Sequence, residues 1–88
     1  MTKRIMSEID YAVGSRLRLR REEAGLSREV FAEETGVAVE TLRDYELGFR
    51  KMRNSELLTF AERLGVEVRW FLDGIKFTAV PRRGGNGV

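Results

Sequence analysis

The strongest constraint in this sequence is Gly36, which stands between two short helical patterns with almost no chain to separate them. Ser27 is a good N-cap for the first pattern, which runs for only two turns before Gly36 ends it. The second pattern begins almost at once and closes at Gly48, a residue suited to a left-handed C-cap. Two helices this short and this close in sequence are expected to pack against each other across a tight turn.

The contact points between two such helices must be small, because a large side chain would push the second helix out of position. Ala32 lets the helices approach, Gly36 takes a turn conformation that a side chain would strain, and Leu42 fills the space between them. The inward positions expected in the first helix are Val30, Phe31 and Ala32, and those of the second segment are Val37, Leu42 and Tyr45. The second helix, predicted from about Val39 to Leu47, then has Val39, Glu40, Arg43 and Asp44 on its outer face.

A longer helix is predicted before this pair. Ser7 and Asp10 form an N-cap arrangement for a helix from about Glu8 to Ala24, and Gly25 ends it. The apolar residues that recur at helical spacing are Ile9, Val13, Leu17 and Ala24. This helix is expected to cover the short pair.

Two further helices are predicted after the pair. Asn54 or Ser55 can cap a fourth helix that ends at Gly65. Its apolar stripe comprises Leu57, Leu58, Phe60, Ala61 and Leu64. A fifth, short helix is expected from Glu67 to Leu72. Ala38, just before the second short helix, has no side-chain oxygen to cap it, which costs about 1 kcal/mol relative to Ser, Thr or Asn in typical hosts.

The end of the chain has a different pattern. Residues 75–80 alternate in a weak strand signal that Pro81 breaks, and residues 82–88 hold three Gly and little else that is apolar. We therefore divide the chain into an N-terminal arm (1–7), one domain (8–74) and a C-terminal extension (75–88). The predicted fold class is all-α, a compact five-helix domain with a short C-terminal strand.

Composition excludes several functions. The 88 residues contain no Cys and no His, so the chain has no thiolate nucleophile and lacks the commonest metal ligand and neutral-pH base. The acidic residues have no metal-ligand or paired-carboxylate spacing, which argues against an enzyme and against a metal or other cofactor. No apolar run approaches the roughly 20 residues of a membrane span, and the first ten residues do not form a secretory signal, so a cytoplasmic location is expected.

The net charge of +2 is small, but it is unevenly distributed. Residues 1–21 carry six Lys or Arg against two acids, residues 22–48 carry two against eight, and residues 49–53 add three cations with no acid. Basic segments therefore flank an acidic centre. From charge alone a short basic run is more often a solvated loop that binds nothing.

Several segments, in order and at family spacing, resemble the Cro and phage-repressor-like helix-turn-helix family, also called the xenobiotic-response-element type. They are Val13-Gly14-Ser15-Arg16-Leu17, Ala24-Gly25-Leu26-Ser27, Phe31-Ala32, Thr35-Gly36-Val37, Thr41-Leu42, Tyr45-Glu46-Leu47-Gly48, Ala61-Glu62-Arg63-Leu64-Gly65-Val66 and Val68-Arg69-Trp70-Phe71-Leu72-Asp73-Gly74. The resemblance covers about residues 13–74 and implies a lambda-repressor-like fold whose recognition helix lies in the major groove of DNA.

The resemblance also implies roles for individual residues. The base-contacting positions are Val39, Glu40, Arg43 and Asp44, and the phosphate-contacting positions are Arg28, Thr41, Arg50, Lys51 and Arg53. Arg21 and Glu46 are expected to form a partly buried ion pair between the first and third helices. Relatives of this type commonly dimerise through their last helix or a C-terminal extension, which here contains Trp70, Phe71, Ile75 and Phe77. The alternative is that these residues simply belong to the core.

The acidic outer face departs from what DNA binding requires, because Glu40 and Asp44 repel phosphates. A carboxylate can accept a hydrogen bond from cytosine N4, and Arg43 can pair with guanine, so this face could be selective while the basic flanks supply affinity. The alternative is that Glu40 and Asp44 are surface charges with no part in base contacts.

Two functions are therefore open. The first is a transcriptional repressor or regulator that binds a palindromic operator in double-stranded DNA as a homodimer, without a small-molecule effector or a membrane. The second is a protein-binding adaptor that keeps the fold and uses the acidic surface of residues 22–48. Phage, restriction-modification and toxin-antitoxin contexts are all compatible with the first.

Overall fold

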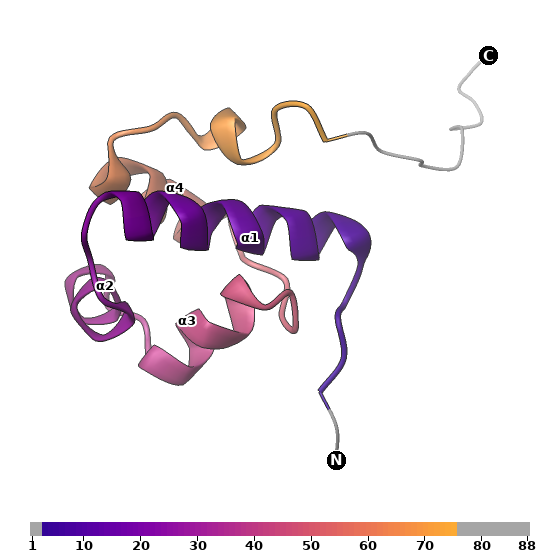
Figure 1. Cartoon of the computed structure of the whole chain (residues 1–88), viewed down its shortest axis with the longest axis horizontal. Helices are drawn as coiled ribbons and strands as arrows, with labels where there is room; N and C mark the ends of the chain where they lie inside the picture. The colour runs from indigo at the N-terminus through magenta and orange to yellow at the C-terminus, as the bar shows by residue number, and fades with distance from the viewer. Residues whose placement is uncertain (1–2, 76–88) are drawn as a thin grey trace.

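The structure, a computed structural model, describes residues 3–75 and is all-helical over that range (Figure 1). Its elements are α1 (Glu8–Glu23), α2 (Arg28–Thr35), α3 (Val39–Glu46), α4 (Asn54–Leu64) and a 3-10 helix, η1 (Val68–Phe71). The predicted all-α, lambda-repressor-like fold is confirmed. The fifth helix is shorter than predicted and of the 3-10 type. Of the predicted strand, residues 75–80, only Ile75 lies within the described residues.

In the view of Figure 1 the long helix α1 has α3 on one side and η1 on the other. It packs against α3, α4 and η1, while α2 packs against α3 and α4. This arrangement leaves the outer face of α3 on the surface of the domain.

The turn between α2 and α3 forms as the sequence predicts. Gly36 has φ 76° and ψ 22°, a left-handed conformation that L side chains rarely adopt, and Val37 N–H donates to the Ala32 carbonyl at 3.0 Å. Ala32 and Leu42 are both buried at the contact between the two helices. The spacing of these residues therefore fixes how α3 is presented.

The core is built on the aromatic ring of Phe60 in α4. Its centroid lies 5.4 Å from that of Phe31 and 6.1 Å from that of Tyr45, so it joins α4 to both helices of the turn unit. The buried apolar residues around these rings are Val13, Leu17, Ala32, Leu42, Met52, Ala61, Leu64 and Phe71.

Two predicted core residues are wrong, because Val30 is 43% exposed and Leu58 is 59% exposed. In α4 the positions Leu57, Phe60, Ala61 and Leu64 already form a complete i, i+3, i+4, i+7 stripe, and Leu58 lies one residue, about 100°, away from it. Similarly, Phe31 and Ala32 fill the inward face of α2. Apolar character alone therefore predicted buried faces of α2 and α4 that are wider than those observed.

Helix boundaries shift by a residue at several ends. Ala24 is the exposed C-cap of α1, and Leu47 is the C-cap of α3. The side chains of Ser7 and Ser27 cap α1 and α2 as predicted, whereas the N-cap of α4 is Arg53 and neither Asn54 nor Ser55. The carboxylate of Glu56 reaches back to the Arg53 N–H at 3.1 Å, so the fourth helix is capped from within its first turn.

Gly14, in the middle of α1, permits the closest approach of α1 to α3. A Cβ atom there would lie 2.0 Å from the carbonyl oxygen of Tyr45, a backbone atom that cannot swing aside. A glycine inside a helix normally costs about 1 kcal/mol relative to alanine. Here only glycine fits, because the backbones of α1 and α3 are in direct contact.

We therefore expect Gly14→Ala to destabilise the protein by at least about 2 kcal/mol, although the same change in an isolated helix is stabilising. Urea denaturation measures the free energy of unfolding. Ser15→Ala, one residue along the same helix, is the matched control and should change stability by no more than about 0.5 kcal/mol. A Gly14→Ala protein as stable as wild type would contradict the close contact of α1 with α3.

Tyr45 connects α3 to α4 through its hydroxyl group, which donates to the Glu56 carboxylate at 2.5 Å. Burial of the ring disfavours the charged phenolate, and the hydrogen bond to Glu56 holds the proton further. Together these effects raise the pKa of Tyr45 from 10.0 to about 12. The folded state therefore holds the phenol proton more tightly than the unfolded chain does.

It follows that Tyr45 stabilises the fold fully below pH 10 and that this contribution is lost as the pH rises from 10 towards 12. Tyr45→Phe should cost about 1 kcal/mol at pH 8, since the hydrogen bond to Glu56 is lost. The difference between wild type and Tyr45→Phe should then narrow above pH 10. Urea denaturation of both proteins between pH 8 and 11.5 tests this, and a constant difference over that range would refute it.

Candidate nucleic-acid interface

The outer face of α3 carries three of the four residues predicted to contact bases. Val39, Glu40 and Arg43 are exposed, because Leu42, Tyr45 and Glu46 take the inward positions of the helix. Within the described residues neither Glu40 nor Arg43 takes part in an ion pair. This face thus offers one carboxylate, one guanidinium and one apolar contact to a ligand.

Asp44, the fourth predicted position, is not free. Lys3 Nζ donates to its two carboxylate oxygens at 2.7 and 2.9 Å, and only 17% of the Asp44 side chain is exposed. The two residues are 41 positions apart, and no local sequence pattern links residues at that separation. The charge of Asp44 is therefore offset by the N-terminal arm.

Glu46 is a fully buried charged residue, with a side chain that is 0% exposed. Arg21 of α1 donates to both of its oxygens, from Nε at 2.6 Å and from Nη2 at 3.0 Å, in the predicted ion pair. Arg28 of α2 adds two more hydrogen bonds to Oε1, at 3.1 and 3.0 Å. One carboxylate therefore joins α1, α2 and α3, and the cluster of Arg21, Arg28 and Glu46 keeps one net positive charge.

The structure changes the role predicted for Arg28. Its guanidinium uses Nε and Nη2 on Glu46, while its side chain stays 27% exposed at the N-terminal end of α2. The remaining Nη1 makes no hydrogen bond within residues 3–75, so its two N–H donors are unused there. Glu46 therefore orients the group that was predicted to contact the DNA backbone.

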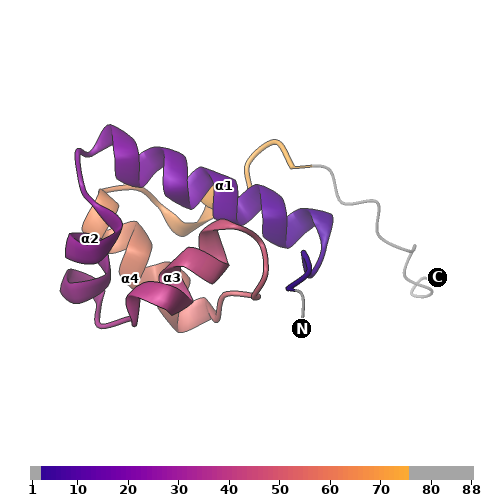
Figure 2. The same cartoon turned by 60° about the horizontal axis from the view of Figure 1, so that its bottom comes forward.

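The other predicted phosphate contacts lie on α3 and on the loop that follows it. Thr41 is half-buried on α3, whereas Arg50, Lys51 and Arg53 are all exposed. Lys51 Nζ lies 4.0 Å from Asp10, a weak contact for a side chain that is 76% exposed. In both views the loop and the N-terminal arm lie beyond the same end of α3 (Figures 1 and 2), so their cations gather there.

Most of the acidity in residues 22–48 is neutralised within the domain. Five of its eight acidic residues have cationic partners: Glu22 with Arg18, Glu23 with Arg20, Glu34 with Arg63, Asp44 with Lys3, and Glu46 with Arg21 and Arg28. The acidic surface that the sequence suggests is therefore much weaker in the folded protein.

Of the residues predicted to dimerise, Phe71 is wrong in this role, since it is fully buried in the domain's own core. Trp70 and Ile75 are half-buried, and Phe77 lies outside the described residues. Arg16 of α1 donates to the Trp70 carbonyl at 2.8 Å and so fixes η1 against α1. This contact spans 54 residues and has no local sequence signal.

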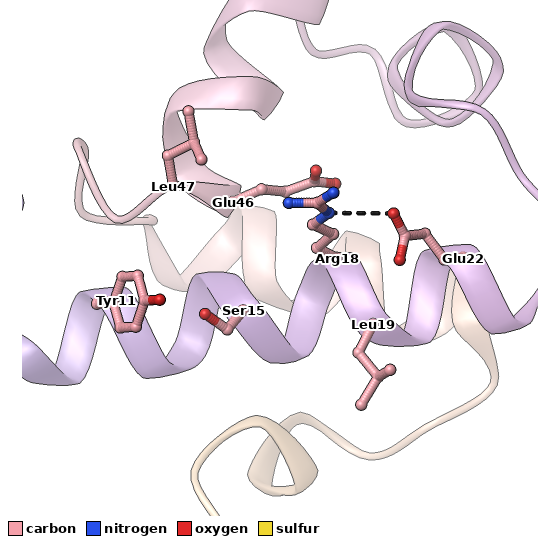
Figure 3. Close-up of a pocket in the computed structure, with 7 residues that line it drawn as sticks. All are labelled: Tyr11, Ser15, Arg18, Leu19, Glu22, Glu46 and Leu47. Carbon is pink, nitrogen blue, oxygen red and sulfur yellow. Dashed lines mark hydrogen bonds and ion pairs between the residues drawn. The ribbon is translucent and has the colours of Figure 1, made fainter.

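A surface pocket of about 230 Å³ lies between α1 and the end of α3, lined by Tyr11, Ser15, Arg18, Leu19, Glu22, Glu46 and Leu47 (Figure 3). Small-molecule sites usually enclose roughly 300–1,000 Å³, so this pocket is small for one. Within residues 3–75 no three His, Cys, Asp or Glu side chains are grouped to hold a metal ion. None of the helices in that range combines the length and hydropathy of a membrane span.

Residues 12–69 match the model of a protein family described as "Helix-turn-helix domain". The chain belongs to this family. The helix-turn-helix match includes the whole of α2, the Gly36 turn and α3.

Among similar sequences, an uncharacterized HTH-type transcriptional regulator of Sinorhizobium medicae is 35% identical over 71 residues, which are 81% of this chain and 51% of that protein. The chain thus spans about half the length of that relative. Among solved structures, the restriction-modification controller protein C.AhdI from Aeromonas hydrophila is 31% identical with a TM-score of 0.66, over 69% of this chain and 92% of that one. The biofilm regulator SinR in complex with DNA gives the same identity and TM-score, over 69% of this chain and 98% of that one.

The shared carboxylate of this helix-turn-helix domain gives a direct test. Glu46→Gln leaves the buried guanidinium of Arg21 with only a 4.0 Å contact to the exposed Glu22 as counter-charge, and we expect it to cost about 3–5 kcal/mol of unfolding free energy. Arg28→Gln should cost less than about 2 kcal/mol, because Arg21 still neutralises Glu46. Thermal or urea unfolding measures both.

Glu34→Gln is the matched control, since it removes one carboxylate from an ion pair with Arg63 that is about 40% exposed on both sides. It should change stability by no more than about 1 kcal/mol. Equal losses for Glu46→Gln and Glu34→Gln would contradict the central role of Glu46.

Proposed function

We propose that this protein is a sequence-specific DNA-binding transcriptional regulator, a repressor that occupies a palindromic operator as a dimer. The observation that carries the proposal is the geometry of α3: an exposed helix face, set on a turn fixed by Ala32, Gly36 and Leu42, with cations near its C-terminal end. A helix held in this way can enter the major groove of B-DNA.

The proposed base contacts come from the N-terminal and central part of α3. Arg43 can donate two hydrogen bonds to guanine O6 and N7, Glu40 can accept one from cytosine N4, and Val39 can pack on a thymine methyl group. Each good contact of this kind discriminates against a wrong base by about 1–3 kcal/mol. Asp44, the fourth predicted position, could accept from a base only if it released Lys3.

The proposed backbone contacts surround that face. Arg28 would approach one phosphate from the N-terminus of α2, where the helix dipole adds to the attraction. Thr41 and the loop cations Arg50, Lys51 and Arg53 would hold the helix in register without choosing a sequence. The similarity to SinR, solved in complex with DNA, supports this assignment.

A dimer is part of the proposal because one domain contacts too little DNA to be selective. Trp70 and Ile75 retain exposed surface on or after η1, on the side of α1 away from α3, and are the proposed dimer contacts together with Phe77. Two-fold symmetry would place two recognition helices about 34 Å apart, one turn of DNA.

The adaptor function has lost much of its support. It depended on the acidity of residues 22–48, and five of the eight acidic residues there are paired within the domain. Glu29, Glu33 and Glu40 remain without an ion-pair partner among residues 3–75, and they lie on two different helices.

Selection from random double-stranded DNA, followed by a mobility-shift assay of the enriched sites, tests the proposal. We expect one enriched sequence with two-fold symmetry and half-sites one helical turn apart. Enrichment of a single half-site would remove the dimer from the proposal, and no enrichment would reject sequence-specific binding.

Two substitutions separate reading from positioning. Arg43→Ala should relax the preference at one base position of each half-site by about 1–3 kcal/mol, because its contacts are to base edges. Arg50→Ala should weaken binding to all sequences alike and reduce the slope of log affinity against log salt by about 1, since it removes a phosphate contact. Titrations at several salt concentrations with selected and scrambled DNA distinguish these results, and equal effects of both changes would contradict the division.

A further inference from the structure

The N-terminal arm, residues 3–7, meets the α3 region at two points. Lys3 Nζ donates to the two carboxylate oxygens of Asp44 at 2.7 and 2.9 Å, and Met6 N–H donates to the Gly48 carbonyl at 2.8 Å. The arm therefore contacts the C-terminal end of α3 and the start of the next loop, and in both views it lies beyond that end of the helix (Figures 1 and 2).

The two partners of the ion pair differ in how far they reach the solvent. The Lys3 side chain is 51% exposed, whereas that of Asp44 is 17% exposed. A ligand that approaches this part of α3 thus meets an ammonium group before it meets the carboxylate. Arg4, also exposed, adds a second cation to the same arm.

We propose that Asp44 is a positioning residue that holds Lys3 at the edge of α3, so that Lys3, and not Asp44, meets the DNA. The inference rests on the DNA-binding function proposed above and changes the role of Asp44 within it. An ammonium group has three N–H donors, and two of them are directed at Asp44. The third is left for an acceptor atom of the DNA.

The backbone hydrogen bond of Met6 helps to hold Lys3 next to Asp44. An exposed ion pair alone orders a chain segment only weakly. The backbone hydrogen bond of Met6 lies three residues further along, so only a short stretch of arm has to be ordered for Lys3 to reach Asp44. Charge pairing and backbone pairing therefore support each other in docking the arm.

A double-mutant cycle tests the role in DNA binding. Lys3→Gln should weaken affinity for the selected DNA roughly tenfold at about 0.15 M salt, because it removes a cation and also uncovers a carboxylate near phosphates. In an Asp44→Asn background the same change should cost about threefold or less, because no carboxylate is uncovered. Coupling of this size supports the proposal.

Arg4→Gln is the matched comparison, since it removes the same charge from the same arm without touching Asp44. It should weaken binding by the same factor in both backgrounds. If Lys3→Gln also gives the same factor in both backgrounds, Lys3 acts only as a diffuse arm charge and the proposal is overturned.

Hydrogen exchange of the Met6 amide tests arm docking in the free protein, without DNA. Lys3→Gln and Asp44→Asn should each reduce its protection several-fold, whereas Arg4→Gln should not. Unchanged protection in both of the first two variants would overturn the docking. If the wild type binds no DNA at all, the proposed function fails and the DNA contact of Lys3 with it, while Met6 protection still reports whether the arm docks.

Discussion

The arrangement of α1, α2 and α3 depends on the hydrogen bonds of the buried Glu46 carboxylate. This carboxylate accepts hydrogen bonds from Arg21 of α1 and Arg28 of α2, so a single side chain of α3 is held by both neighbouring helices. Burial of a lone carboxylate would be very costly, and two guanidinium groups at about 3 Å offset that cost through charge-assisted hydrogen bonds. Because the geometry of guanidinium and carboxylate is planar and directional, the cluster fixes the orientation of α3 as well as its position.

The same cluster connects the fold to the proposed DNA contact. Arg28 is held by Glu46 yet remains partly exposed, so the group proposed to bind phosphate is oriented before DNA arrives. An oriented donor loses less side-chain entropy on binding than a free one. Gly14 contributes in a different way, since the absence of its side chain lets α1 approach the backbone of Tyr45, which precedes Glu46 in α3. Backbone contact and buried charge therefore act on the same turn of the helix.

The sequence predicted correctly the features that depend on residues close together in the chain. The turn at Gly36, its neighbours Ala32 and Leu42, and the caps at Ser7 and Ser27 depend on residues within a few positions of one another, and the structure has them as expected. The pairs Lys3 with Asp44 and Arg16 with the Trp70 carbonyl join residues 41 and 54 positions apart, and only the packed fold brings them together. Val30 and Leu58 show the opposite limit, because an apolar residue beside a complete stripe is left at the surface once the stripe is filled.

The acidic residues on the outer face of α3 differ in whether they have an ion-pair partner. Asp44 is covered by Lys3, so Glu40 is the carboxylate on the outer face without an ion-pair partner in the described part of the chain. A carboxylate in the major groove is repelled by the backbone of every sequence, and only a cytosine amino group in the right place compensates it. Glu40 would therefore lower affinity for non-specific DNA more than for the operator. Since a regulator competes against a large excess of wrong sites, a lower non-specific affinity raises the ratio on which occupancy depends. In the proposed DNA complex the acidic position would be a source of selectivity, and the surrounding cations would restore the affinity that it removes.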